Sequence, residues 1–210
     1  MRALDAIVVI NDLAASQRGL FTAAQAQALG VDRVSLARLA DRGQIERLCH
    51  GVYRSGGAPL FREVEILAAW MALEPTLLLS QRDRGAGGFV ASLNTAAWLQ
   101  ELGELNPTPI TFSHPARRQV RKRGLLFVKR ELAESDVTEA GGIPATTPGR
   151  TVLDLLDSDE DLSLVGGVLN DALGFGFISD ENRFALEVNE RASRRGFDKG
   201  FPLYEYLRRR

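Results

Sequence analysis

The stretch that decides the fold is residues 32–54, which reads DRVSLARLADRGQIERLCHGVYR. It opens with Asp32, a residue type that caps helix N-termini, and apolar residues then recur at helical spacing as far as Arg42. Gly43 ends this helix, because glycine readily adopts the left-handed conformation found just past helix ends. Two β-prone runs follow, and the two-residue, glycine-containing link between them predicts a hairpin. The two runs are Ile45–Cys49 and Val52–Arg54.

Two more helices are predicted before this stretch. Ala3–Gln17 carries leucine, isoleucine and valine at helical spacing. Thr22 is a predicted N-cap for a short helix over Ala23–Leu29, and Gly30 suits the position just past its end. The order is therefore helix, helix, tight turn, helix, hairpin. This is the arrangement of a winged helix-turn-helix domain.

The helix that begins at Arg33 is the candidate recognition helix, because the second helix of a helix-turn-helix lies in the major groove with its N-terminal residues toward the bases. Its inner side is predicted to comprise Val34, Leu36 and Leu39, with Val31 just before them. Arginine suits the outer side, since its fork pairs with two acceptors of guanine or with a phosphate. We therefore expect double-stranded DNA as a partner. The predicted DNA-binding residues are Arg33, Ser35, Arg38 and Arg42 of the helix, and Arg47, His50 and Arg54 of the hairpin.

The same arginines have a simpler interpretation that the sequence leaves open. Many amphipathic helices carry arginines that only keep the surface solvated, and Arg38 and Arg42 fit that role as well. Asp41 and Glu46 are close enough in sequence to pair with these arginines. The hypothesis of DNA binding therefore depends on the order of the whole unit more than on any single side chain.

The bulk composition is that of an ordinary soluble globular protein. The chain has 210 residues, of which 45% are hydrophobic and 25% charged, and its net charge is −1. Its single cysteine, Cys49, cannot form an internal disulfide, which fits a reducing compartment. No apolar run reaches the roughly 18 residues of a membrane span. We therefore expect a cytoplasmic protein with no membrane partner.

The best predicted linker is Ser55–Pro59, which divides the chain into residues 1–57 and 58–210. Helices are predicted beyond it over Phe61–Leu73, Leu93–Leu102, Pro148–Leu156, Leu162–Leu173, Asp180–Arg194 and Phe201–Arg209. Strands are predicted over Thr76–Leu79, Ile110–Phe112 and Leu125–Val128, and Gln81–Gly88 is predicted to be a mobile loop. The fold class is therefore α+β, with an N-terminal winged helix-turn-helix domain and a mixed α/β C-terminal domain.

A basic run between two predicted strands is a possible second electrostatic contact, or simply a solvated loop. Its cationic residues are Arg117, Arg118, Arg121, Lys122 and Arg123. Arg150 and Asp154 stand four apart on one predicted helix, which favours a local ion pair. Trp70 and Trp98 are predicted to be core residues. With two histidines and one cysteine, no zinc spacing is present, and no phosphate-binding loop with its lysine occurs. We therefore expect no metal, no cofactor and no catalytic activity.

Several segments resemble the AbiEi-type antitoxin family of abortive-infection, type IV toxin–antitoxin systems. The most specific is GVYR at 51–54, and others extend the resemblance across residues 19–156. These others are GLFTAAQA (19–26), LGV (29–31), LARL (36–39), GQIERL (43–48), ASLNTAAWL (91–99) and IPATTPGRTVLDL (143–155). The loop over residues 81–88 and the pair Asn94–Thr95 depart from the family pattern.

The resemblance implies a separate role for each domain. The winged helix is expected to bind operator repeats near its own promoter and repress the operon. The C-terminal domain is expected to counteract a toxin with a nucleotidyltransferase-like fold. Operator repeats require two recognition helices, so a homodimer or paired monomers are expected on DNA. The alternatives are a protein-interaction module that neutralises the toxin by direct binding, and a plain winged-helix transcriptional regulator. A metal-dependent nuclease is a further alternative.

Overall fold

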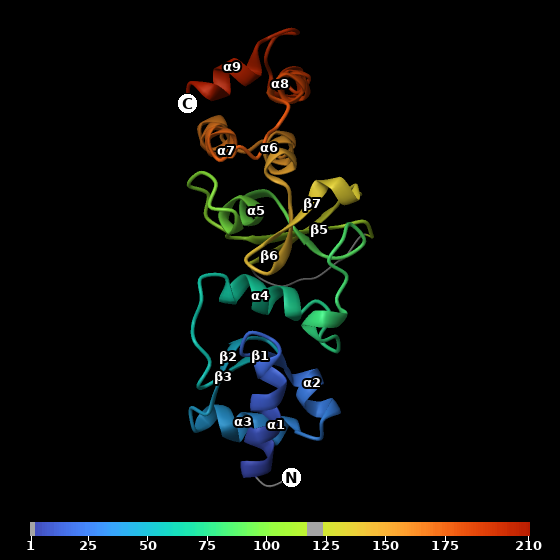
Figure 1. Ribbon diagram of the computed structural model, residues 1–210, viewed down its shortest axis with the longest axis vertical. Helices are drawn as coiled ribbons and strands as arrows, with labels where there is room; N and C mark the ends of the chain where they lie inside the picture. The colour runs from blue at the N-terminus through green and yellow to red at the C-terminus, as the bar shows by residue number, and fades with distance from the viewer. Residues whose placement is uncertain (1–2, 117–123) are drawn as a thin grey trace. The chain divides into compact units, whose positions relative to one another are not determined.

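The computed structural model describes residues 3–116 and 124–210 of the chain, apart from the side chain of Ala3. The chain folds into two compact units that divide between Asp83 and Arg84. Figure 1 shows the elements of both units in chain order.

The first unit is a winged helix-turn-helix with one added helix. Its elements are α1 (Ala3–Ala15), β1 (Leu20–Thr22), α2 (Ala23–Ala28), α3 (Arg33–Asp41), β2 (Ile45–Cys49), β3 (Val52–Ser55), α4 (Val64–Met71) and the 3-10 turn η1 (Leu79–Gln81). The strands form an antiparallel sheet in the order β1-β3-β2. This sheet lies between α4 and the helices α1 to α3 (Figure 1).

Both predicted helix caps of this unit are confirmed. The Thr22 hydroxyl accepts a hydrogen bond from the Gln25 amide at 3.0 Å, and the Gln25 side chain accepts one from the Thr22 amide at 2.9 Å, which completes a capping box. Asp32 accepts a hydrogen bond from the Ser35 amide at 2.7 Å and so opens α3. The start and direction of α3 are therefore set by its own local sequence.

The core beneath α3 confirms three of the four predicted inner residues. Val31, Leu36 and Leu39 are buried together with residues of α1, β1 and β2. Val34 was predicted to lie on this inner side, and that prediction is wrong, since 59% of the residue is exposed. The reason is helical geometry: at about 100° per residue, Val34 stands about 160° from Leu36 around the helix axis.

The first compact unit continues past the predicted boundary at residues 57/58. The guanidinium of Arg82 is buried and donates to the carbonyl oxygens of Trp70, Met71 and Glu74 at 2.9, 2.8 and 2.6 Å. The carbonyls of Trp70 and Met71 lie at the C-terminal end of α4, where a helix leaves backbone acceptors without intrahelical partners, and Glu74 lies just past that end. Arg82 thereby joins the segment after α4 to the first unit. A division at the glycine-rich linker misses this contact, because the contact depends on one distant side chain.

The predicted strand over Thr76–Leu79 is wrong. The segment forms a turn that leads into η1, and its backbone bonds to side chains instead of to a neighbouring strand. Gln25 donates to the Leu77 carbonyl at 2.7 Å, and the Leu79 amide donates to the side-chain oxygen of Gln17 at 3.1 Å. The two glutamines also bond to each other, at 3.1 Å in both directions.

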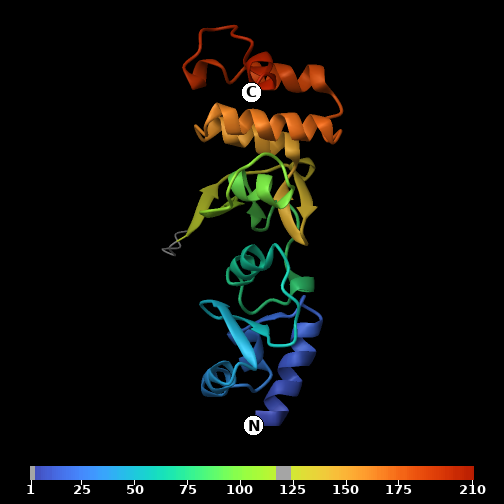
Figure 2. The same cartoon turned by 90° about the vertical axis from the view of Figure 1, so that its left-hand side faces the viewer.

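The second unit is built on a mixed sheet in the order β6-β5-β4-β8-β7. Its elements are β4 (Val90–Ala91), α5 (Leu93–Leu99), β5 (Ile110–His114), β6 (Leu125–Lys129), η2 (Glu134–Asp136), β7 (Val137–Ala140), β8 (Ile143–Thr146), α6 (Pro148–Asp157), α7 (Leu162–Gly174), α8 (Glu181–Asn189), η3 (Ser193–Arg195) and α9 (Leu203–Arg208). Helix α5 packs on the sheet, α6 on α5 and α7 on α6, while α8 and α9 pack on α6 and α7 (Figure 2). The predicted α+β class, with a mixed α/β C-terminal domain, is confirmed.

The loop predicted to be mobile, Gln81–Gly88, is held by side-chain contacts within each unit. Beyond Arg82, Arg84 pairs with Glu139 at 2.6 Å and donates to the Gly142 carbonyl at 3.0 Å. The Ala86 amide donates to Glu134 at 3.2 Å. The sequence pattern of glycine and polar residues did not reveal these arginine anchors.

The predicted ion pair within α6 is confirmed. Arg150 donates to Asp154 at 2.7 Å and also pairs with Asp136 at 3.0 Å. Asp154 is buried, and its second carboxylate oxygen contacts Arg130. This network joins α6 to η2 and to the segment between β6 and η2. Of the two tryptophans predicted to be core, Trp70 is buried and Trp98 is half-buried.

Candidate nucleic-acid interface

Helix α3 carries three arginines whose side chains are exposed to solvent. Arg33, Arg38 and Arg42 are exposed, while Leu36 and Leu39 anchor the opposite side of the helix in the core. Within residues 3–116 and 124–210, the side chains of these arginines make no ion pair or hydrogen bond. Pairing with Asp41, which the sequence left open, is therefore absent from the described structure. These three arginines place positive charge on the outer side of α3.

The side chain of Asp32 lies at the N-terminal end of the same helix. Hydrogen bonding from the backbone amide of Ser35, and next from the Ser35 side chain, lowers the pKa of Asp32 below its ordinary value of 3.8. Ser35 itself is half-buried beside this cap. The cap therefore places a negative charge next to Arg33 at the N-terminal end of α3.

Arg54, the last of the predicted hairpin residues, forms hydrogen bonds within the protein. It stands directly across the hairpin from Glu46 and donates to its carboxylate from Nε at 3.0 Å and from Nη2 at 2.6 Å. A further nitrogen contacts the carbonyl oxygen of Ala58, and only 14% of the Arg54 side chain is exposed. Cross-strand pairs of opposite charge stabilise hairpins. Arg54 therefore holds the wing together, and its charge is largely neutralised by Glu46.

The tip of the hairpin presents Arg47 and His50, both exposed. Arg47 Nη2 lies 3.1 Å from His50 Nδ1, and Arg47 Nε donates to the Cys49 carbonyl at 3.4 Å. Because a guanidinium nitrogen can only donate, Nδ1 accepts here and the imidazole proton sits on Nε2. Gly51 has a φ of +77°, which glycine adopts without strain and which the tight link requires. The wing tip thus offers one arginine and one imidazole N–H to a ligand.

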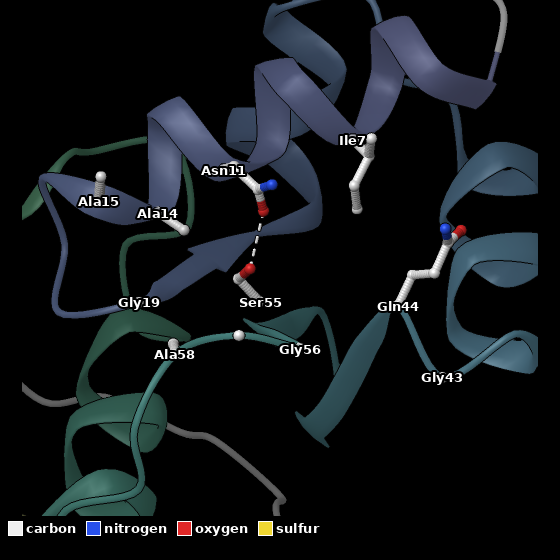
Figure 3. A pocket seen from close by; sticks show the side chains of 11 residues that line it. Ile7, Asn11, Ala14, Ala15, Gly19, Gly43, Gln44, Ser55, Gly56 and Ala58 are labelled. Carbon is white, nitrogen blue, oxygen red and sulfur yellow. Dashed lines mark hydrogen bonds between the residues drawn. The ribbon is translucent and has the colours of Figure 1, made fainter.

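A shallow groove of about 490 Å³ lies beside α1, and Figure 3 shows its lining. Across it the Ser55 hydroxyl donates to Asn11 Oδ1 at 2.8 Å (Figure 3). The remaining lining is mostly apolar, with small residues such as Ala14, Ala15 and Ala58. None of the predicted DNA-binding residues lines the groove. The groove and the arginine-bearing side of α3 are therefore separate features of the unit.

Other parts of the predicted site fall outside this surface. The basic run of Arg117, Arg118, Arg121, Lys122 and Arg123 lies outside the described residues. Throughout the described part of the chain, no group of three or more His, Cys, Asp or Glu side chains is placed to hold a metal ion. Among the helices that the structure describes, none has the length and apolar character needed to cross a membrane.

The position of Val34 is the feature of this surface that sequence analysis missed. The signal was present in the spacing, since Val34 stands only two residues from Leu36. Two residues on a helix do not share a face, so both cannot point into one core. The pairing of Glu46 with Arg54 was among the alternatives that the sequence left open.

The order of elements, the caps and the antiparallel wing define the first unit as a winged helix-turn-helix of the kind found in DNA-binding regulators. Residues 9–56 match the family described as transcriptional regulator, AbiEi antitoxin. The resemblance inferred from the sequence is therefore confirmed for this N-terminal segment. The match supports a role as a regulator or antitoxin.

Comparison with solved structures supports the fold of the whole chain. The crystal structure of RV2827C protein from Mycobacterium tuberculosis aligns with a TM-score of 0.55 and 17% sequence identity. The alignment covers 95% of this chain and 78% of that one. At this identity the likeness concerns the fold alone. A comparison with curated proteins gives no match.

Proposed function

We propose that the protein is an antitoxin that binds operator DNA near its own gene and represses its own operon. The observation that carries this proposal is a set of exposed arginines on α3, namely Arg33, Arg38 and Arg42, which have no ion-pair partner among the described residues. Phosphates are suitable partners for such a set, because each phosphate that an arginine neutralises releases counterions condensed on the DNA. Arg47 and His50 at the wing tip extend the same surface. Arg54 serves this surface indirectly by stabilising the wing.

The family match supports the antitoxin part of the proposal. The second unit counteracts a toxin with a nucleotidyltransferase-like fold, and the protein itself catalyses no reaction and needs no cofactor. It acts in the cytoplasm. Two copies bind the repeats of one operator, because two recognition helices a helical turn apart read such a site.

The test is a titration of a labelled duplex from upstream of the gene, followed by fluorescence anisotropy at several salt concentrations. The triple variant Arg33→Ala, Arg38→Ala, Arg42→Ala should bind about 100-fold more weakly at moderate salt, if each arginine is worth about 1 kcal/mol. Its salt slope should fall by up to about three units, one for each phosphate that is no longer neutralised.

The matched control is Arg183→Ala in the second unit. This arginine is also exposed on a helix, with 78% of its side chain accessible, and it pairs with Glu187 at 3.3 Å. The control should bind DNA like the wild type. If the wild type fails to bind its upstream DNA, or the control loses as much affinity as the triple variant, the proposal is wrong.

A second candidate function is a protein-interaction module that neutralises the toxin by direct binding. Phe175 and Phe177 favour it, since their residues are 62% and 55% exposed and their rings contact each other at 5.9 Å between centroids. Exposed aromatic pairs are frequent anchors of protein interfaces. The double variant Phe175→Ser, Phe177→Ser should lose co-purification with the product of the adjacent gene. Unchanged co-purification would count against a role of this pair in binding.

A further inference from the structure

Val34 is an exposed valine whose presence neither folding nor helix formation explains. It is 59% exposed, so it contributes little to the core. A β-branched side chain also lowers helix propensity slightly compared with alanine or a long polar residue. A single exposed apolar residue is ordinary on a protein surface. The position of Val34 on α3, however, points to a function for this side chain.

The outer side of α3 has a centre and two rims. Residues three and four apart share a face, so Val34, Ala37, Arg38 and Asp41 form one exposed stripe along the helix. At about 100° per residue, Arg33 lies about 100° to one side of Val34 and Arg42 about 80° to the other. The buried residues Leu36 and Leu39 stand on the far side. Val34 is therefore at the centre of the outer side, with an arginine toward each rim.

A helix lying in the major groove turns its central stripe to the base edges and its rims to the two phosphate backbones. Val34 is the second residue of α3, which belongs to the N-terminal part that faces bases. The neighbour one turn on is Ala37, which is small enough to let the helix approach closely. An apolar side chain at such a place meets the C5 methyl group of thymine, the apolar feature of the major-groove edge.

We infer that Val34 is a specificity-determining residue that packs against a thymine methyl group, while Arg33 and Arg42 hold the flanking phosphates. This inference rests on the proposed function. Valine suits the task because its χ1 angle has one strongly preferred rotamer in a helix, so little side-chain freedom is sacrificed when it packs against a base. Arg38, on the same stripe, is then placed to pair with a guanine one turn further along the helix.

The experiment replaces thymines of the bound upstream duplex one at a time with deoxyuridine, which removes only the C5 methyl group. Affinities for wild type and Val34→Ala are measured by anisotropy. At one thymine in each half-site, the wild type should lose about fourfold in affinity, the amount expected for burying one methyl-sized group. Val34→Ala should show no further loss at that same position. Its salt slope should equal that of the wild type, whereas Arg33→Ala should lower the slope by about one unit.

The outcomes separate this inference from the proposed function. If the wild type does not bind the upstream duplex, the proposed function fails. If it binds but no thymine couples to Val34, the inference is overturned while the proposed function stands. A uniform loss of affinity across all duplexes in Val34→Ala would also overturn it, because that result indicates a contact between copies. The melting temperature of Val34→Ala should match or exceed that of the wild type, which excludes unfolding as a cause.

Discussion

Replacing Arg82 with methionine should destabilise the first unit by about 3 kcal/mol. The guanidinium makes three short hydrogen bonds to carbonyl oxygens at and just past the end of α4, and bonds from a charged donor contribute about 1.5–3 kcal/mol each. Desolvation offsets part of this gain, since burial lowers the pKa of Arg82 to about 10. A depression of that size corresponds to about 3 kcal/mol against the charged form. Methionine retains apolar packing but leaves the Met71 carbonyl without the donor that Arg82 supplies, whereas the carbonyls of Trp70 and Glu74 keep the backbone amides of Leu73 and Leu77 as donors.

Urea unfolding followed by tryptophan fluorescence measures this loss. The chain has two tryptophans, and Arg82 lies over the ring of Trp70 at 4.9 Å, so a Trp98→Phe background makes the signal specific for the first unit. The matched control is Arg84→Met, which removes an exposed pair with Glu139 and should cost less than about 1 kcal/mol. Equal losses for the two variants would show that the buried contacts of Arg82 do not stabilise α4.

Three further predictions concern other charged groups. Asp32→Ala should lower the melting temperature at neutral pH, while Asp32→Asn should change it less. The pKa of Asp32 is lowered in the folded state, so its contribution to stability is lost as the pH falls below 3.8. In a series of thermal melts, the difference in melting temperature between wild type and Asp32→Ala should therefore vanish over that pH range. Asp154→Ala should cost about 3 kcal/mol in urea unfolding, since it leaves Arg150 without its closest partner, and a loss below about 1 kcal/mol would contradict the role given to that network. Glu46→Gln should tighten binding to the upstream duplex and steepen its salt slope, because it removes a negative charge from the wing and leaves the charge of Arg54 unneutralised, whereas unchanged binding would mean that the wing does not reach the phosphates.

Sequence reasoning worked best where a short stretch determines its own structure. The caps at Thr22 and Asp32 and the tight hairpin are local devices, so residue type and spacing were enough to predict them. Thr147 at the start of α6 is another, since it accepts from the Arg150 amide with Pro148 in the first turn.

The elements that the sequence did not reveal depend on partners far along the chain. Strand β1 has three residues and exists because Leu20–Thr22 pairs with β3. Strand β8 contains Pro144, which argues against a strand when the sequence is considered alone. It pairs with both β4 and β7, and those contacts decide its conformation.

The candidate site shows the same limit. The arginines of α3 were predicted as outward-facing and are exposed, because a 3.6-residue period places them opposite the core. Whether an exposed arginine is paired with a carboxylate was harder to predict than whether it is exposed. Arg54 is neutralised by Glu46, whereas Arg38 has an acidic neighbour in Asp41 and stays unpaired within the described residues. Which of these arginines forms an ion pair is decided by side-chain geometry and not by distance along the sequence.

The hydrogen-bonded pair of Gln17 and Gln25 in the first unit limits where the chain can be truncated. Gln25 sits in the capping box that starts α2, and the same amide reaches the backbone at Leu77. A fragment cut after Gly57 would lose that backbone and with it the hydrogen bonds that Gln25 and Gln17 make to Leu77 and Leu79. The smallest piece of this chain that keeps its recognition helix in order should therefore end near Asp83.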